Sequence, residues 1–98
     1  MKTAKTKQFT LDLNLDDKEE VDSFIFSYGK VESNLIAERL GLHGEGSVEL
    51  ADTLLNYAWN KRDAIFCREC GDIESAVMYE NICDSIYSND IAPVCNCW

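Results

Sequence analysis

The stretch AIFCRECGDIESAVMYE, residues 64–80, decides the fold of this chain. Its centre is the pair Gly71-Asp72, and apolar residues recur at helical spacing on both sides of that pair. Glycine readily adopts the left-handed conformation that ends a helix, and an aspartate side chain caps the first turn of the next one. The stretch therefore predicts an antiparallel helical hairpin with a tight corner.

Both arms of this hairpin continue outward. Ser47 is a natural N-cap, and a helix is predicted over 47–70 on a stripe formed by Val48, Ala51, Leu55, Ala58, Trp59, Arg62, Ile65 and Phe66. A second helix is predicted over 72–88, with an inward face formed by Ile73, Ala76, Val77, Tyr79, Cys83, Ile86 and Tyr87. Residues 89–98, which include Pro93, are expected to form a tail.

The N-terminal half begins with a polar, lysine-rich segment, residues 1–8, expected to be a flexible arm. Apolar Phe9, Leu11, Leu13 and Leu15 then alternate with polar residues, a period that predicts a strand over 9–15 with one buried face. This strand pairs with the tail around residues 91–95, with its own copy in a homodimer, or with another protein, because an unpaired edge is a binding surface.

Residues 16–40 are predicted to form one helix interrupted at Gly29, or two helices, and the glycine-rich segment 41–46 is predicted to be a loop. With 98 residues the chain is expected to be a single domain. The predicted fold class is mainly α: three to four helices in a small bundle, with an antiparallel C-terminal helical hairpin and one short N-terminal β-strand.

The segment Gly71-Asp72-Ile73-Glu74-Ser75-Ala76, followed by Tyr79, resembles the inter-helix corner and second helix of a tetratricopeptide repeat. The resemblance covers about a quarter of the chain. Such units need about three stacked copies for stability, and this sequence contains one. The resemblance implies a single helical hairpin with a surface that binds another protein.

Charge narrows the classes of partner. The formal net charge is −9, so nucleic acid and anionic membranes should repel the protein. The three lysines of the N-terminal arm offer too few phosphate contacts for strong binding, and we expect no direct nucleic-acid partner.

The sequence shows neither a membrane-spanning apolar run nor a secretion signal, and its odd number of cysteines, five, fits a reducing compartment. We expect a cytoplasmic protein that does not bind membranes.

The cysteines allow one alternative interpretation. Cys67, Cys70, Cys95 and Cys97 supply the four thiolates that a tetrahedral zinc site needs, although their spacing is unusual and Cys83 is left over. A small zinc-stabilised module is therefore an alternative. Redox catalysis by Cys67 and Cys70 is disfavoured because both lie near the negative end of a helix.

No catalytic constellation is found. His43, the only histidine, lies in the glycine-rich loop, and the acidic pairs Glu19/Glu20 and Glu80/Asp84 fit a helix start and a polar helix face. We therefore expect a non-enzymatic protein without a cofactor.

Acidic residues dominate segment 63–90, in which Arg68 is the only base. One interpretation is a solvated face that maintains solubility. The sharper hypothesis is a surface for a basic protein partner, made of Asp63, Glu69, Asp72, Glu74, Glu80 and Asp84.

The leading functional hypothesis is a small acidic protein-binding module, similar in size and charge to phage-encoded inhibitors of host defence and to immunity proteins of nuclease toxins. Such a module would inhibit a basic protein that handles nucleic acid. The alternative is a helical adaptor or homodimeric assembly protein that uses the strand of Phe9, Leu11, Leu13 and Leu15.

Overall fold

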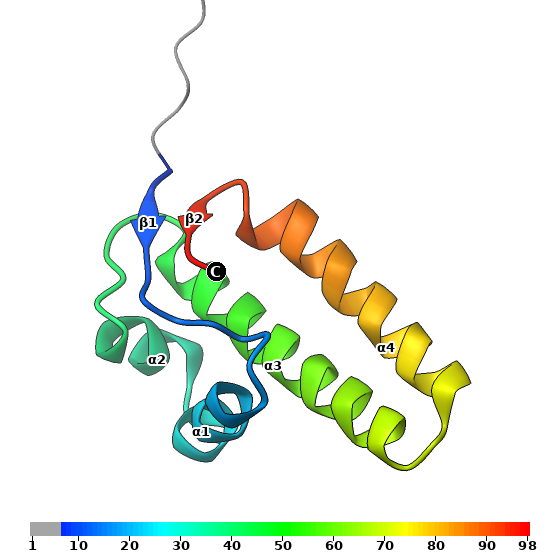
Figure 1. Ribbon diagram of the computed structural model, residues 1–98. Coiled ribbons are helices and arrows are strands. Elements are labelled where there is room, and N and C mark those ends of the chain that lie inside the picture. Colours follow the sequence, from blue (N-terminus) through cyan, green and yellow to red (C-terminus); the bar gives the residue numbers. More distant parts are fainter. Residues whose placement is uncertain (1–6) are drawn as a thin grey trace, which may run out of the picture.

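The computed structural model describes residues 7–98, so most of the predicted arm at 1–8 lies outside the described residues. In chain order the elements are β1 (Phe9–Thr10), α1 (Lys18–Tyr28), α2 (Ser33–Arg39), α3 (Ser47–Glu69), α4 (Ile73–Ile86), the π-helical turn η1 (Tyr87–Ile91) and β2 (Cys95–Asn96). The predicted mainly helical class with a C-terminal helical hairpin is confirmed (Figure 1).

Helix α3 is the centre of the molecule. Helices α1 and α2 lie along one side of it and α4 lies antiparallel along the other (Figure 1). The Cα atoms extend over 46 × 36 × 18 Å, so the molecule is thin in one direction. As a result, α4 packs chiefly against α3 and leaves much of its own surface uncovered.

The hydrophobic core lies where α1, α2, the first half of α3, η1 and the two short strands meet. Its fully buried larger side chains are Leu15, Val21, Ile36, Leu54, Cys83, Ile91 and Cys95. Residues 7–98 contain no buried charged side chain. Burial of apolar surface at this junction therefore supplies the main stabilisation of the fold.

Local signals set the start of α1 and the corner between α3 and α4. Asp17 caps α1 by accepting a hydrogen bond from the Glu20 amide at 3.1 Å. At the hairpin corner, Gly71 has a φ of +86° and Asp72 accepts from the Ser75 amide at 3.2 Å. The Gly-Asp corner is thus a left-handed stop followed by an N-cap, and both assignments are confirmed.

The region predicted as one interrupted helix or two is two helices, separated by residues 29–32. The predicted strand over 9–15 is wrong in length, because only Phe9–Thr10 forms a ladder, parallel to Cys95–Asn96. The alternation persists as burial: Phe9 and Leu15 are buried, and Leu11 and Leu13 are partly buried. The period therefore indicates a buried face. The ladder ends with a hydrogen bond from the Leu11 amide to the Asn96 carbonyl at 3.0 Å, and beyond it Trp98 packs on Tyr57 and Tyr87.

The predicted inward face of the last helix is also partly wrong. Ala76 and Cys83 are buried, but Ile73 is 49% exposed and Val77 is 42% exposed. The α-helix ends at Ile86, and the chain continues as the π-helical turn η1 to Ile91. The periodicity overestimated the buried face because this part of α4 has only α3 as a neighbour.

Candidate functional site

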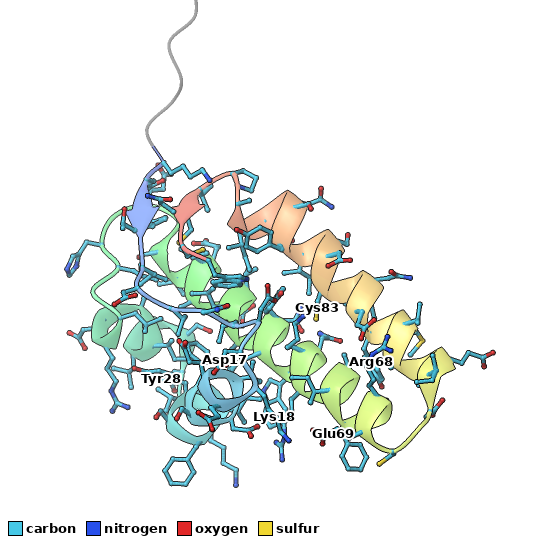
Figure 2. The ribbon with its side chains drawn as sticks, in the orientation of Figure 1. Asp17, Lys18, Tyr28, Arg68, Glu69 and Cys83 are labelled. Atoms are coloured by element: carbon cyan, nitrogen blue, oxygen red, sulfur yellow. The ribbon has the colours of Figure 1, made fainter. Side chains whose placement is uncertain are left out.

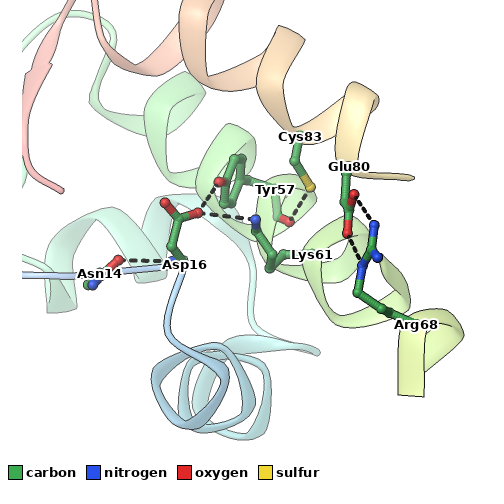
Figure 3. Close-up of polar contacts among 7 residues, drawn as sticks. All are labelled: Asn14, Asp16, Tyr57, Lys61, Arg68, Glu80 and Cys83. Carbon is green, nitrogen blue, oxygen red and sulfur yellow. Dashed lines mark hydrogen bonds and ion pairs between the residues drawn. The ribbon is translucent and has the colours of Figure 1, made fainter. Parts of the chain in front are cut away.

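Two of the predicted partner-binding acids are held in ion pairs. The guanidinium of Arg68 donates to both carboxylate oxygens of Glu80 at 2.8 Å, a fork that joins α3 to α4 (Figure 3). Glu69, at the end of α3, accepts from Lys18 of α1 at 2.7 Å, and both residues are labelled in Figure 2. Hydrogen bonding and the charge of Arg68 lower the pKa of Glu80, and Glu69 raises the pKa of Lys18. These two acids are therefore less available to a partner than the sequence suggests.

The other predicted acids differ in role. Asp72 is the N-cap of α4. Asp63, Glu74 and Asp84 are exposed and form no ion pair with any residue in the described range. The structure thus divides the predicted acidic face into two paired residues, one structural cap and three carboxylates that remain open to a partner.

A polar cluster that the sequence did not reveal lies beside α3. The Tyr57 hydroxyl donates to Asp16 at 2.6 Å, and the Lys61 ammonium lies 3.2 Å from the same Asp16 oxygen (Figure 3). Asp16 is itself oriented, because its backbone amide donates to the Asn14 side chain at 3.0 Å. Asp16 belongs to the segment before α1, so this cluster ties the N-terminal segment to α3 over a long sequence separation.

Burial first, and then the hydrogen bond to Asp16, raise the pKa of Tyr57 well above its usual range. The phenol therefore remains a hydrogen-bond donor at all physiological pH values. The Lys61 side chain is only 18% exposed, and its ammonium lies 5.6 Å from the centre of the Tyr57 ring. The Lys61 ammonium therefore forms a cation–π contact with the face of the Tyr57 ring.

The cluster forms part of a pocket of about 490 Å³, lined by Asp16, Tyr57, Lys61, Asp84, Tyr87, Ser88 and Trp98. Three of these residues are aromatic: the Trp98 ring centre lies 5.3 Å from that of Tyr57 and 5.3 Å from that of Tyr87. The Tyr87 hydroxyl donates to the Trp98 carbonyl, which fixes the last described residue against the π-helical turn.

A second hollow, of about 340 Å³, shares Asp16 and Lys61 with this pocket and continues along α3 to Arg68 and Glu80. We call the two hollows together the α3 groove. On α4, Glu80 lines the second hollow and Asp84 lines the pocket. Ile73 and Val77 line neither hollow but lie on the same face of α4, nearer the corner, and we call these four residues together the groove row. The groove row is apolar near the corner and acidic toward the pocket.

The cysteines do not form a metal site. No group of three or more candidate metal ligands is found within residues 7–98. Cys67 and Cys70 lie at the corner end of α3, whereas Cys95 and Cys97 lie beside its opposite end (Figure 1). A stretch of α3 about 25 Å long separates the two pairs at about 1.5 Å per residue. Within residues 7–98 the structure therefore does not bring together the four cysteines of the zinc alternative.

The surroundings of three cysteines raise the pKa of their thiols. Burial raises the pKa of Cys83 to about 11, and burial together with the Cys97 hydrogen bond raises that of Cys95 to about 12. Burial and the nearby Asp72 carboxylate raise the pKa of Cys67. Each shift disfavours the reactive thiolate form.

The proposed dimer strand is already used within the chain. Phe9 and Leu15 are part of the core, Leu11 and Leu13 pack against it, and β1 pairs with β2. The apolar face of this segment is therefore turned toward the core of its own chain.

Comparison with family models, with curated proteins and with solved structures found no match. The resemblance of the corner to a tetratricopeptide repeat therefore has no support beyond the hairpin itself. Within residues 7–98, no helix has the length and apolar character needed to cross a membrane. Fold and site together define the class: a small, mainly helical protein with a thin helical hairpin and a polar groove along its central helix.

Proposed function

We propose that the protein is a non-catalytic protein-binding module, whose groove row contacts a partner with a basic and partly apolar surface. The observation that carries this proposal is the composition of the groove row, in which exposed Ile73 and Val77 are followed by the unpaired Asp84. An exposed apolar pair followed by a free carboxylate is complementary to a partner surface that is apolar at one end and basic at the other.

The apolar part of the groove row would supply affinity. Ile73 and Val77 are one helical turn apart, and Val77 is 42% exposed, so both can be buried together by one partner surface. Burial of apolar area is the main favourable term in most protein associations. The corner end of the hairpin would thus act as the apolar centre of the contact.

The acidic part would supply partner selection. The net charge of −9 attracts basic proteins over a distance, and Asp84 of the groove row has no ion-pair partner within residues 7–98. Complementary charge increases the association rate and disfavours acidic partners. A basic protein that normally binds nucleic acid is the kind of partner that this surface fits, and inhibition would follow if the module occupied that basic surface.

A capture experiment from lysate of the source organism tests the proposal. The wild type is compared with Asp84→Lys and Val77→Lys, and with the control Glu38→Lys, which makes the same charge change as the first variant on α2. We expect a basic protein to be captured by the wild type and by the control but not by the two groove-row variants. Capture should also be lost in about 1 M salt, where the Debye length is about 3 Å.

Capture that survives both groove-row variants and high salt would contradict the proposal. Circular dichroism of all four proteins checks that the substitutions leave the fold intact, which is expected because each altered side chain is exposed.

A further inference from the structure

We propose that the pocket formed by Asp16, Tyr57, Lys61, Asp84, Tyr87, Ser88 and Trp98 is a receptor for one arginine side chain of the partner. This inference rests on the proposed function and names the group that the acidic end of the groove row recognises. Three independent features of the pocket lead to a guanidinium: its charge balance, its aromatic walls and its size.

The pocket lacks one positive charge. Its charged lining consists of Asp16, Lys61 and Asp84. Lys61 is paired with Asp16 at 3.2 Å, whereas Asp84 has no ion-pair partner within residues 7–98. A monovalent cation bound at Asp84 would balance the lining, and a guanidinium can donate two hydrogen bonds to one carboxylate.

The aromatic walls suit a flat cation. Tyr57, Tyr87 and Trp98 line the pocket as one packed aromatic cluster, with ring centres 5.3 to 6.4 Å apart. Tyr57 is buried within this cluster, so the partly exposed rings of Tyr87 and Trp98 are the ones that a cation can stack on. Lys61 already shows that this environment accepts a cation, since its ammonium lies 5.6 Å from the centre of the Tyr57 ring. Arginine stacks on aromatic rings more readily than lysine, because its guanidinium is planar and weakly hydrated.

The size and position of the pocket also fit. Its volume of about 490 Å³ lies within the range of about 300–1,000 Å³ that is usual for ligand sites. It adjoins the acidic end of the groove row, because Asp84 belongs to both. A partner that covers Ile73 and Val77 could therefore reach the pocket with one side chain.

The first test uses N-acetylarginine amide as the probe, with N-acetylcitrulline amide as a neutral control of nearly equal shape. The isotope-labelled full chain is titrated with each compound and followed by NMR. We expect saturable shifts of the Trp98 indole, assigned with the help of Trp59→Phe, for the arginine compound only. Equal shifts with the citrulline compound, or none with arginine, would overturn the proposal, and stronger binding of N-acetyllysine amide would overturn the choice of arginine.

The second test uses two variants with opposite expected signs. Asp84→Asn removes the unpaired carboxylate and should weaken binding of the arginine compound about two- to five-fold, the range of an exposed ion pair. Lys61→Gln removes the competing cation, leaves Asp16 with the Tyr57 hydrogen bond but no ion pair, and should strengthen binding by a similar factor. Glu38→Gln, on α2, is the matched control and should change nothing. Unchanged affinity in Asp84→Asn, or weaker binding in a folded Lys61→Gln, would contradict the charge argument.

These results are separable from those of the capture experiment. If the arginine compound fails to bind while the groove-row variants still abolish capture, the proposed function stands and the arginine pocket is wrong. If the arginine compound binds with the expected signs while capture is unaffected, the pocket stands and the proposed function is wrong.

Discussion

The two halves of the α3–α4 hairpin use the same kind of helix for different purposes. We call the half of the hairpin at the Gly71-Asp72 corner the tip, and the opposite half, which contains residues 47–58 of α3, the base. In the base, α3 buries Leu50, Ala51, Leu54, Tyr57 and Ala58 against its neighbours. In the tip half, residues 59–69 bury only Ala64, and Phe66 is 64% exposed. Both halves are continuous helix, so secondary structure alone does not distinguish them.

The difference comes from the number of neighbours. The base is covered by α2, η1 and the paired strands, whereas α3 and α4 extend beyond these elements toward the tip (Figure 1). There α3 has α1 beside it, and the last contact between them is the exposed Lys18–Glu69 ion pair. Apolar residues at the base therefore stabilise the fold, and those at the tip remain on the surface. An apolar helix face thus identifies a core only where a second element is present to cover it.

The largest expected contrast is between Leu54→Ala and Phe66→Ala. Leu54 has no exposed surface, and its truncation should lower the free energy of unfolding by about 2–5 kcal/mol. Phe66 is largely exposed, so its truncation should change stability by less than about 0.5 kcal/mol. Urea unfolding of both variants measures the two values. If Phe66→Ala lowers the free energy of unfolding as much as Leu54→Ala does, the base and the tip contribute equally to stability and the comparison fails.

A smaller effect is expected from Tyr57→Phe, which removes the hydrogen bond to Asp16 at the boundary between base and tip. We expect a loss of about 1–2 kcal/mol at neutral pH. In the unfolded chain Tyr57 titrates near its ordinary pKa of 10.0, whereas burial and Asp16 raise its pKa in the folded protein. Its contribution is therefore complete below pH 10 and is lost as the pH rises above that value.

The stability difference between wild type and Tyr57→Phe should accordingly shrink above pH 10. Urea unfolding at a series of pH values provides the measurement, and the comparison of the two proteins cancels the titration of the cysteines. If the stability difference between the two proteins stays constant to high pH, the ionisation of the Tyr57 hydroxyl does not contribute to the pH dependence of stability.

The smallest effect is expected at the tip, from Arg68→Gln. The Arg68–Glu80 pair is exposed, and such pairs contribute little to stability. Arg68 lowers the pKa of Glu80, so the contribution of the pair is present above the ordinary pKa of 4.5 and is lost as the pH falls below it. An NMR titration should find the pKa of Glu80 raised toward 4.5 in Arg68→Gln, with almost no change in the unfolding midpoint at neutral pH. An unchanged Glu80 pKa would contradict the observed fork.

The sequence predicted the local features of the hairpin well. Gly71 and Asp72 act through their own backbone and a neighbouring amide, and the observed helix Ser47–Glu69 matches the predicted 47–70 closely. The predicted N-cap at Ser47 is wrong, because Gly46, with a φ of +86°, takes the cap position and Ser47 is the first residue of α3. Such signals need no information about distant residues. Alternation over 9–15 likewise identified which side chains are buried.

The site could be predicted only in part. Glu80 and Asp84 were recognised as acidic, but the fork to Arg68 and the pairing of Asp16 with Tyr57 and Lys61 depend on how distant segments meet. The contact between Trp98 and Tyr57 could not be predicted for the same reason, since it forms only because the tail returns to α3. The exposure of Ile73 and Val77 also requires knowledge that no further element covers α4.

The parallel ladder between β1 and β2 has a consequence for how the molecule folds. Phe9 pairs with Cys95, so the first and last elements of the described chain complete the core together. Closing so long a loop costs entropy that is recovered only when nearly all other contacts exist. The helices can form while the chain is still being synthesised, but Phe9 gains its final neighbours, Val94 and Cys95, only after the tail has left the ribosome.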